Sequence, residues 1–511
     1  MPTLTLDGTS LSLDRLAPIF EGGELQISVT PAAMERVKAA RQLVDEKVDS
    51  GEAVYGLTTG FGKLKNVTIA REDLEQLQEN LVLSHCCGMG DPMPIEEVRA
   101  VQVLRLNGLV RGHSGVRVSL VEALVRFFQK GFVPVVPQQG SVGASGDLAP
   151  LAHVVATYMG YGEVFLKGTR MPASEALKLV GEEPLRLAAK EGLALINGTE
   201  VMKAIAAGVL LRARRLSKLS DVVASITIEA LFGSLRPFDE RIAALKSQPG
   251  HDRTASNVRR CLAGSNVLAS HTDCDRVQDP YSLRCIPQVH GAFKAALAHV
   301  DEVMLPEWNA VTDNPILFPD TGEVISAGQF HGQPISMVMD YLGLALCTVA
   351  NISERRIEQL VNPDLSRLPS FLAKDPGLNS GMMIAQVTAA ALASENKVWA
   401  HPASVDTVPT SANQEDHVSM GPTAARKARA IVTNAERVVA IEFLCACQAR
   451  EFHPEVAPGP GAQAAHDVLR KYITPMDADR YLHPDLVKAW ELIRGDEVLR
   501  AVEASIGALE A

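Results

Sequence analysis

The chain has 511 residues, well above the size at which one hydrophobic core stops growing, so about three domain-sized units are expected. Hydrophobic residues make up 47%, aromatic residues 5% and charged residues 21%, a composition that favours buried helices rich in Ala, Leu and Val. The formal net charge of -11 argues against a broad surface for nucleic acid or for an anionic membrane.

The sequence also narrows the cellular location and the possible cofactors. The N-terminal segment lacks the basic and apolar stretches of a secretion signal, and no later segment offers about 18 uninterrupted apolar residues. We therefore expect a cytoplasmic protein that does not enter a membrane. The eight cysteines contain no Cys-x-x-Cys pair, so free thiols are expected. His-Glu-x-x-His and His/Cys ligand clusters are absent from the sequence, so no catalytic metal is expected.

Residues 1–110 are expected to form a mixed N-terminal region, with strand-like pieces at 4–6 and 25–29 and with helices between Gly-rich turns. Tyr55 opens the Gly-rich loop 55–62, whose sharp backbone could carry the tyrosine into a pocket. The loop lacks the Gly-Lys-[Ser/Thr] ending of a P-loop, which excludes that kind of phosphate site.

The tract 140–153 contains the tripeptide Ala144-Ser145-Gly146. If a tight bend presses the Gly146 nitrogen onto the Ala144 carbonyl carbon, cyclisation and loss of two waters leave an imidazolone ring with a methylidene derived from Ser145. Gly146 lacks the Cβ that would block this approach, and only Ser145 can lose a hydroxyl. For a bare Ala-Ser-Gly, an ordinary surface loop is the better interpretation. A serine hydrolase is a weaker alternative, because the second glycine of Gly-x-Ser-x-Gly is missing.

From residue 197 onward, apolar residues at three- and four-residue spacing predict long helices over about 201–232, 288–304, 335–361, 380–399 and 422–448. Such helices are typical of a bundle. We expect region 111–453 to be a domain that holds the tripeptide and the bundle, and a Pro/Gly-rich break to separate a C-terminal helical tail, 454–511. Apolar faces rich in small residues, as in 382–393, indicate burial between subunits.

Other residues have a functional and a structural interpretation. Tyr281 and Arg284 are three residues apart and would share a helical face. Arg284 can form a bidentate pair with a carboxylate, but it could equally bridge helix ends, and Tyr281 could be a core aromatic. Asn197 is most simply a helix N-cap. His85 alone would usually be a buried, hydrogen-bonded histidine.

Taken together, these motifs resemble the aromatic amino acid ammonia-lyases over nearly the whole chain. The matching segments are the Tyr55 loop, the tract 140–153, and 195–199, 278–285, 312–315, 379–381 and 411–417. The resemblance implies a mainly α fold with a long central helical bundle and a smaller mixed N-terminal region, of the fumarase/aspartase-like superfamily architecture. It also implies a homotetramer whose active sites are shared between subunits. The cofactor would be the 4-methylidene-imidazole-5-one (MIO) group formed from Ala144, Ser145 and Gly146, with no external cofactor.

Carried over residue by residue, the resemblance implies two sets of site residues. The catalytic set is Tyr55, Ala144, Ser145, Gly146, Tyr281 and Glu415. The substrate-binding set is His85, Asn197, Gln278, Arg284, Phe330 and Met383. Either tyrosine could take the β-proton of the substrate, and the choice stays open. One departure is Gln329, where related lyases usually have Asn.

The expected substrate follows from two positions, the Ser84-His85 pair and Glu415, where relatives that act on phenylalanine or tyrosine differ. A histidine and a carboxylate suit an imidazole, which donates and accepts hydrogen bonds and can carry positive charge. The expected reaction is therefore elimination of ammonia from L-histidine to give trans-urocanate, the first step of histidine degradation. Two alternatives remain: an aminomutase, which would return the amine to the β-carbon, and a non-catalytic helical scaffold, in which the tripeptide would stay unmodified.

Overall fold

The computed structural model describes residues 2–23, 25–52, 54, 56–60, 62, 65–270 and 277–511. The chain divides into two compact units, and each unit gathers three stretches of sequence. Unit 1 consists of Met1–Gly208, Glu302–Met339 and Pro402–Arg426, and unit 2 consists of Val209–Asp301, Asp340–His401 and Lys427–Ala511. The sequence predicted three consecutive regions with boundaries near residues 110 and 453, and these boundaries stay a prediction.

Unit 1 contains the small sheets of the described chain. The strands predicted at 4–6 and 25–29 are confirmed as β1 (Thr3–Leu6) and β2 (Gln26–Val29), which pair in parallel. The other pairings are antiparallel: β3 (Met89–Pro92) with β5 (Pro137–Gln139), β4 (Phe132–Pro134) with β6 (Glu163–Leu166), β6 with β7 (Thr169–Pro172), and β8 (Ile316–Phe318) with β9 (Glu323–Ile325).

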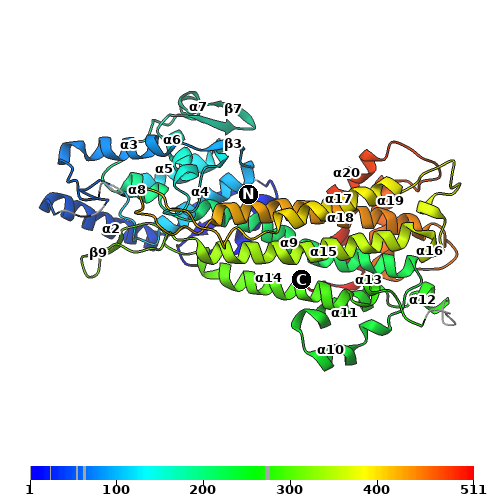
Figure 1. Ribbon diagram of the computed structural model, residues 1–511. Helices are drawn as coiled ribbons and strands as arrows, with labels where there is room; N and C mark the ends of the chain where they lie inside the picture. The colour runs from blue at the N-terminus through cyan, green and yellow to red at the C-terminus, as the bar shows by residue number, and fades with distance from the viewer. Residues whose placement is uncertain are drawn as a thin grey trace. The chain divides into compact units, whose positions relative to one another are not determined.

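Figure 1 draws the helices that belong wholly to unit 1 in colours from blue to blue-green. They are α1 (Leu13–Phe20), α2 (Pro31–Ser50), η2 (Arg71–Asp73), α3 (Leu74–His85), α4 (Ile95–Leu109), α5 (Val118–Gln129), α6 (Leu148–Tyr158), α7 (Ala173–Val180) and α8 (Glu191–Ile196). Helix α3 packs against α6 and α8. These three helices therefore hold together the two segments, before 148 and after 196, that later meet at the site.

Helix α4 is buried on nearly all sides, and its polar residues are paired inside unit 1. Gln102 donates hydrogen bonds to the Tyr158 hydroxyl and the Phe132 carbonyl, both at 2.9 Å. The Tyr158 ring stacks on Phe127 with centroids 4.8 Å apart, and the Phe127 and Phe132 rings lie 5.2 Å apart. Buried polar groups of this kind cost stability unless they are hydrogen-bonded. These contacts tie α4 to α5 and α6 inside unit 1.

The predicted long helices are confirmed. They are α9 (Glu200–Ala230), α14 (Ile286–Glu307), α15 (Gln333–Val361), α17 (Met383–Trp399) and α18 (Gly421–Arg450). All except α17 contribute residues to both units. The remaining elements belong to unit 2 and are η3 (Arg236–Phe238), α10 (Glu240–Lys246), α11 (Pro249–Cys261), α12 (Asn266–Ser270), α13 (Tyr281–Arg284), α16 (Pro363–Ser366), η4 (Ser370–Leu372), α19 (Pro460–Tyr472), α20 (His483–Arg494) and α21 (Glu497–Ile506).

The long helices of unit 2 are tied together by buried ion pairs. Arg356 of α15 donates to both carboxylate oxygens of Glu442 on α18, at 2.6 and 2.8 Å, and Thr227 of α9 donates to Glu442 at 2.8 Å. Asp221 of α9 pairs with His290 and Lys294 of α14. Among the described helices, α15 is long and apolar enough to cross a membrane by length and composition, and most of its apolar window is buried. Its buried Arg356 is typical of a core helix.

The fold is therefore mainly α, with a long helical bundle and a smaller mixed region at the N-terminus, as expected. The described cysteines are free thiols.

Candidate active site

The tripeptide Ala144-Ser145-Gly146 lies in a tight turn before α6. Ser145 and Gly146 have φ values of 50° and 78°, a region that residues with a Cβ seldom adopt. A Cβ on Gly146 would lie 2.1 Å from the Gly198 carbonyl oxygen, so only glycine fits. The Asp147 amide donates to that same oxygen at 2.6 Å. The turn is thus pressed against the segment before α9, and because Gly146 and Asp147 are buried it is not an ordinary surface loop.

Asn197 contacts the turn directly. Its side-chain Nδ2 donates to the Ser145 carbonyl oxygen at 2.7 Å. Its interpretation as a helix N-cap is wrong, because the amides of Val201 and Met202 at the start of α9 donate instead to Asp147 Oδ2, at 2.8 and 3.0 Å. A carboxylate from a distant segment therefore caps α9, and the Asn197 side chain is free to face the tripeptide.

Asp147 is a residue to which no sequence pattern assigned a role. Burial raises the pKa of its carboxyl to about 7, and the nearby negative charge of Glu200 acts in the same direction, while the two α9 amides lower it. Its only signal in the sequence is its place directly after Gly146. The residue fastens the tripeptide to the N-terminus of α9, where the helix dipole favours negative charge.

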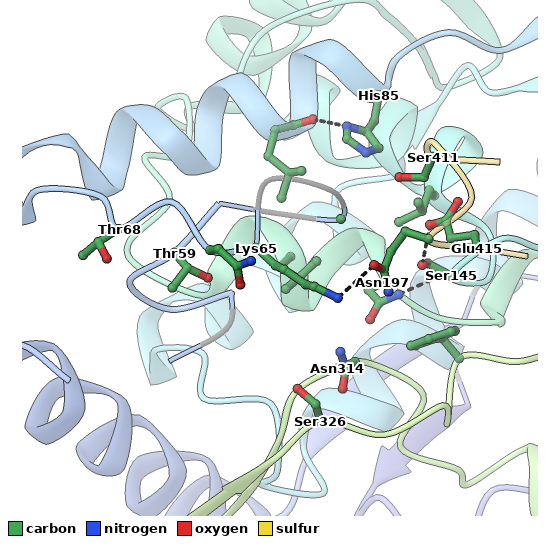
Figure 2. A pocket seen from close by; sticks show the side chains of 17 residues that line it. Thr59, Lys65, Thr68, His85, Ser145, Asn197, Asn314, Ser326, Ser411 and Glu415 are labelled. Carbon is green, nitrogen blue, oxygen red and sulfur yellow. Dashed lines mark hydrogen bonds between the residues drawn. The ribbon is translucent and has the colours of Figure 1, made fainter. Parts of the chain in front are cut away.

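A cavity of about 750 Å³ in unit 1 opens onto Ser145 (Figure 2). Of the residues predicted for the site, it brings together His85, Ser145, Asn197, Phe330 and Glu415. These come from α3, from the turn before α6, from the segment after α8, and from the loops at 326–331 and 411–415. Tyr55 lies outside the described residues.

Glu415 reaches Ser145 from a strained loop. Its Oε1 accepts a hydrogen bond from Ser145 Oγ at 2.9 Å, and its Oε2 accepts one from Thr410 Oγ1 at 2.8 Å. Thr410 and Glu415 form an antiparallel bridge, and the three residues from Ser411 to Asn413 all have positive φ. This sharp turn points the carboxylate at the tripeptide, a contact that spans 270 residues of sequence.

His85 is the last residue of α3 and is half-buried at the cavity wall. Its Nδ1 lies 2.7 Å from the Leu81 carbonyl oxygen, which fixes the ring orientation. If Nδ1 carries the proton for that bond, Nε2 is left as the acceptor. His85 is therefore hydrogen-bonded, as a structural histidine would be, but it is only half-buried and lines a cavity.

The cavity also has a cationic side chain that sequence patterns missed. Lys65 lines it, and the Lys65 Nζ donates to Gln414 Oε1 at 2.8 Å (Figure 2). Lys65 therefore links the segment after the Tyr55 loop to the residue beside Glu415. Gln329 lies elsewhere: it lines a separate hollow of about 870 Å³ with Asn309 and Phe318. Within the described part of the chain, no group of three or more His, Cys, Asp or Glu residues could hold a metal ion.

Four of the predicted residues belong to unit 2 and do not line this cavity, namely Gln278, Tyr281, Arg284 and Met383. Tyr281 and Arg284 share a face of α13, with the Arg284 guanidinium carbon 4.4 Å from the Tyr281 ring centre. Tyr281 is 71% exposed, so it is not a core aromatic. Arg284 Nε is buried without a hydrogen-bond partner among the described residues. Gln278 is exposed just before α13, and Met383 is half-buried at the first position of α17.

The fold and the site define a class of protein: a helical-bundle protein whose cavity opens onto an Ala-Ser-Gly turn. The profile of the aromatic amino acid lyase family matches residues 11–471. The chain belongs to this family.

The chain is also similar to individual proteins of known name. The chain is 48% identical over 504 residues to the histidine ammonia-lyase of Myxococcus xanthus, with 99% of each chain covered. It resembles the crystal structure of histidine ammonia-lyase from Trypanosoma cruzi with a TM-score of 0.92 and 39% identity, covering 99% of this chain and 96% of that one. It also resembles the tyrosine aminomutase of Streptomyces globisporus with a TM-score of 0.94 and 33% identity, with full coverage of both chains.

Proposed function

We propose that this protein is an ammonia-lyase that converts L-histidine to trans-urocanate and ammonia. The observation that carries the proposal is the cavity in which Ser145, at a strained turn, meets Glu415 and His85. The similarity to histidine ammonia-lyases over essentially the whole chain supports it. Membership of a lyase family argues against a non-catalytic scaffold.

The prosthetic group of the proposal is MIO, and the residues present fit its formation. Ring closure joins the Gly146 nitrogen to the Ala144 carbonyl carbon and releases two waters, one of them with the Ser145 hydroxyl. It requires a compressed turn, an absent Cβ and a held carbonyl, which match the positive φ values, the Gly198 contact and the Asn197 hydrogen bond. The group supplies an electrophile that no side chain provides. No external cofactor or metal is part of the proposal.

His85 and Glu415 are proposed to select the substrate. Both are polar groups at a partly desolvated cavity wall, and an imidazole can pair with each of them. A phenyl ring would leave both unpaired, which costs more than its extra apolar contact returns. Phe330 and Met383 are proposed to line the site, and Asn197 to hold the Ser145 carbonyl.

The carboxylate and the β-proton of the substrate need further groups. Arg284 offers a fork of N–H donors for the carboxylate, and its buried Nε has no described partner. Gln278 would assist it. Tyr55 and Tyr281 are the candidates for removing the β-proton. We assign the unit 2 residues, Gln278, Tyr281, Arg284 and Met383, to the cavity of another copy of the chain.

Exposed apolar helix faces support assembly into a homotetramer. On α15, Met337 is 58% exposed, and Tyr341 and Leu344 follow one and two turns later on the same face. On α17, Ile384 is 64% exposed and Val387 lies beside it. Exposed apolar side chains aligned along a helix in this way are typical of an interface between subunits. The tetramer would act in the cytoplasm.

Two measurements on the purified protein test the proposal. Steady-state assays should show urocanate formed from L-histidine, with little turnover of L-phenylalanine or L-tyrosine. The intact mass should be lower than that of the plain sequence by two waters, located in the peptide that contains residues 144–146, and Ser145→Ala should abolish both this loss and the activity. An active protein with an unmodified mass would contradict the MIO proposal.

A second candidate, an aminomutase, is favoured only by the similarity to the tyrosine aminomutase structure. Release of free ammonia in equal amount to substrate consumed would exclude it. The double variant His85→Leu, Glu415→Gln tests substrate choice, and its histidine turnover should fall on the order of 100-fold or more, because both partners of the imidazole are lost. Faster turnover of tyrosine than of histidine by the unmodified protein would overturn the substrate while leaving the lyase class.

A further inference from the structure

A buried cluster of charges lies directly behind Asn197. Glu200, in the first turn of α9, accepts hydrogen bonds from Lys203 at 3.1 Å and from Thr312 at 2.8 Å. Arg105 of α4 forms an ion pair with the other carboxylate oxygen of Glu200 at 3.3 Å, and this oxygen accepts no hydrogen bond from the described residues. Glu200 is fully buried, and Arg105 and Lys203 nearly so. Charges buried this deeply cost stability unless they are paired and hydrogen-bonded with good geometry.

The cluster is joined to the site through one backbone carbonyl. Arg105 Nη1 and Nη2 both donate to the Asn197 carbonyl oxygen, at 2.7 and 3.2 Å. The next residue, Gly198, is enclosed by the same groups: a Cβ there would lie 2.3 Å from Glu200 Oε2 and 2.7 Å from Arg105 Nη2. The peptide after Asn197 is therefore held from behind, while the Asn197 side chain reaches forward to the Ser145 carbonyl oxygen at 2.7 Å.

Glu200 must be ionised to pair with Arg105, and its surroundings favour the ionised form. Burial alone would raise the pKa of Glu200, but the positive charges of Arg105 and Lys203 and the Thr312 hydrogen bond outweigh burial and lower it. Glu200 thus stays an anion at neutral pH and holds the Arg105 guanidinium in place. A lysine could not reproduce the contact fully, because its ammonium cannot present a planar fork to a carbonyl and a carboxylate together.

We propose that Arg105, fixed by Glu200, is a positioning residue that aims the Asn197 amide at the Ser145 carbonyl. It acts on the tripeptide through Asn197 and does not touch the substrate. The inference rests on the proposed function, because it concerns formation of the electrophile and reaction at the same turn.

The test compares Arg105→Met, Arg105→Lys and a matched control, Arg212→Met. Arg212 lies on the same helix as Glu200 and forms an ion pair with Glu436, at 2.9 and 2.7 Å. Its hydrogen-bond partners among the described residues, Glu436 and Thr433, do not line the cavity. For each variant we would measure the intact mass, the thermal midpoint, and kcat and KM for L-histidine. Unlike activity, the mass reports on the tripeptide even in an inactive protein.

In Arg105→Met, part of the molecules should fail to lose the two waters, or kcat should fall on the order of 100-fold with a much smaller change in KM. The reason is that misplacing a group in the active site by about 1 Å costs roughly 100-fold in rate. Arg105→Lys should recover part of the loss. Arg212→Met should lose thermal stability but mature fully and keep its kcat within a few-fold. Combining Arg105→Met with Asn197→Ala should add little to the loss caused by Asn197→Ala alone, if the residual turnover is measurable.

Full water loss together with a near-normal kcat in Arg105→Met would overturn the inference. Equal defects in Arg105→Met and Arg212→Met would do the same, because the cluster would then act only through general stability. Failure of the proposed function is recognised separately, since the unmodified protein would then form no urocanate from histidine.

Discussion

The tripeptide turn of unit 1 and helix α13 of unit 2 carry the two halves of the proposed chemistry, and they are built in opposite ways. Around the turn, Ser145 bonds to Glu415, its carbonyl to Asn197, and Asp147 to the start of α9. On α13, Tyr281 is 71% exposed and Arg284 Nε has no partner among the described residues. Each of these side chains at the turn has a partner in the same chain, although Asp147 Oδ1 is buried with no hydrogen-bond partner among the described residues. Helix α13 instead presents an exposed tyrosine and a buried Arg284 Nε without a partner in the described part of the chain.

The difference follows from what each region has to do. Compressing a backbone turn requires fixed, buried contacts that supply strain continuously, and a single chain can provide them. Gripping a substrate requires groups whose hydrogen bonds are made only when a ligand arrives, because satisfied groups have nothing to gain from binding. The unpartnered Nε of Arg284 fits a binding role of this kind.

The largest effect is expected at the tripeptide turn. Gly146→Ala should abolish the loss of two waters and all activity, because the new Cβ would lie 2.1 Å from the Gly198 carbonyl oxygen. The matched control is Gly168→Ala, at a similar φ of 81° but with no atom within 4 Å of the new Cβ. It should cost only about 1 kcal/mol of stability. Both variants are tested by intact mass and by activity assays. A Gly146→Ala protein that has lost the two waters and is active would show that the turn is not compressed.

The second largest effect is expected at Arg284 on α13. Arg284→Ala should lower kcat/KM for L-histidine by roughly 10- to 100-fold, because a charge-assisted hydrogen bond typically contributes about 1.5 to 3 kcal/mol. Arg284→Lys should recover part of this, since it restores the charge without the fork. Unchanged kcat/KM in Arg284→Ala would mean that another cation holds the carboxylate, and Lys65 is the ammonium group that lines the described cavity.

Co-expression of Ser145→Ala and Arg284→Ala chains sharpens the comparison between regions. If one copy supplies the turn and another supplies α13, mixed oligomers contain some sites with both residues intact, and activity should rise several-fold above that of either variant alone. The control is Ser145→Ala mixed with Glu415→Ala, two residues of the same cavity, which should show no rise. Absence of a rise in the first mixture would place both regions of a site in a single chain.

The smallest expected effect concerns pH. Burial raises the pKa of Asp147 to about 7 from its ordinary value of 3.8, so the folded protein keeps this proton at a pH where the unfolded chain has released it. The stability it contributes is full below about pH 4 and is lost as the pH rises towards 7. Between pH 5 and pH 8 the thermal midpoint should fall by a few degrees more in the unmodified protein than in Asp147→Asn. Parallel midpoints over this range would show that Asp147 is ionised throughout.

Local patterns predicted much of the fold. The long helices were predicted within a few residues, as for α17, expected over 380–399 and observed at Met383–Trp399. Apolar spacing along a helix depends on near neighbours, so a single sequence reveals it. Asn197 shows where this reasoning stops: beside a glycine and before a helix it matches a cap, but the cap comes from Asp147, a residue on another segment.

The sequence by itself determined that Ala144, Ser145 and Gly146 follow one another in the order that the cyclisation needs, that long helices follow, and that a histidine and a glutamate are present to suit an imidazole. Tertiary structure decided that Glu415 touches Ser145 across 270 residues, that Asp147 caps α9, and that Arg105 holds the carbonyl of Asn197. The reason is physical. Periodicity and turn chemistry act over a few residues, whereas the partner of a buried polar group is whichever group the packed helices bring within hydrogen-bond distance.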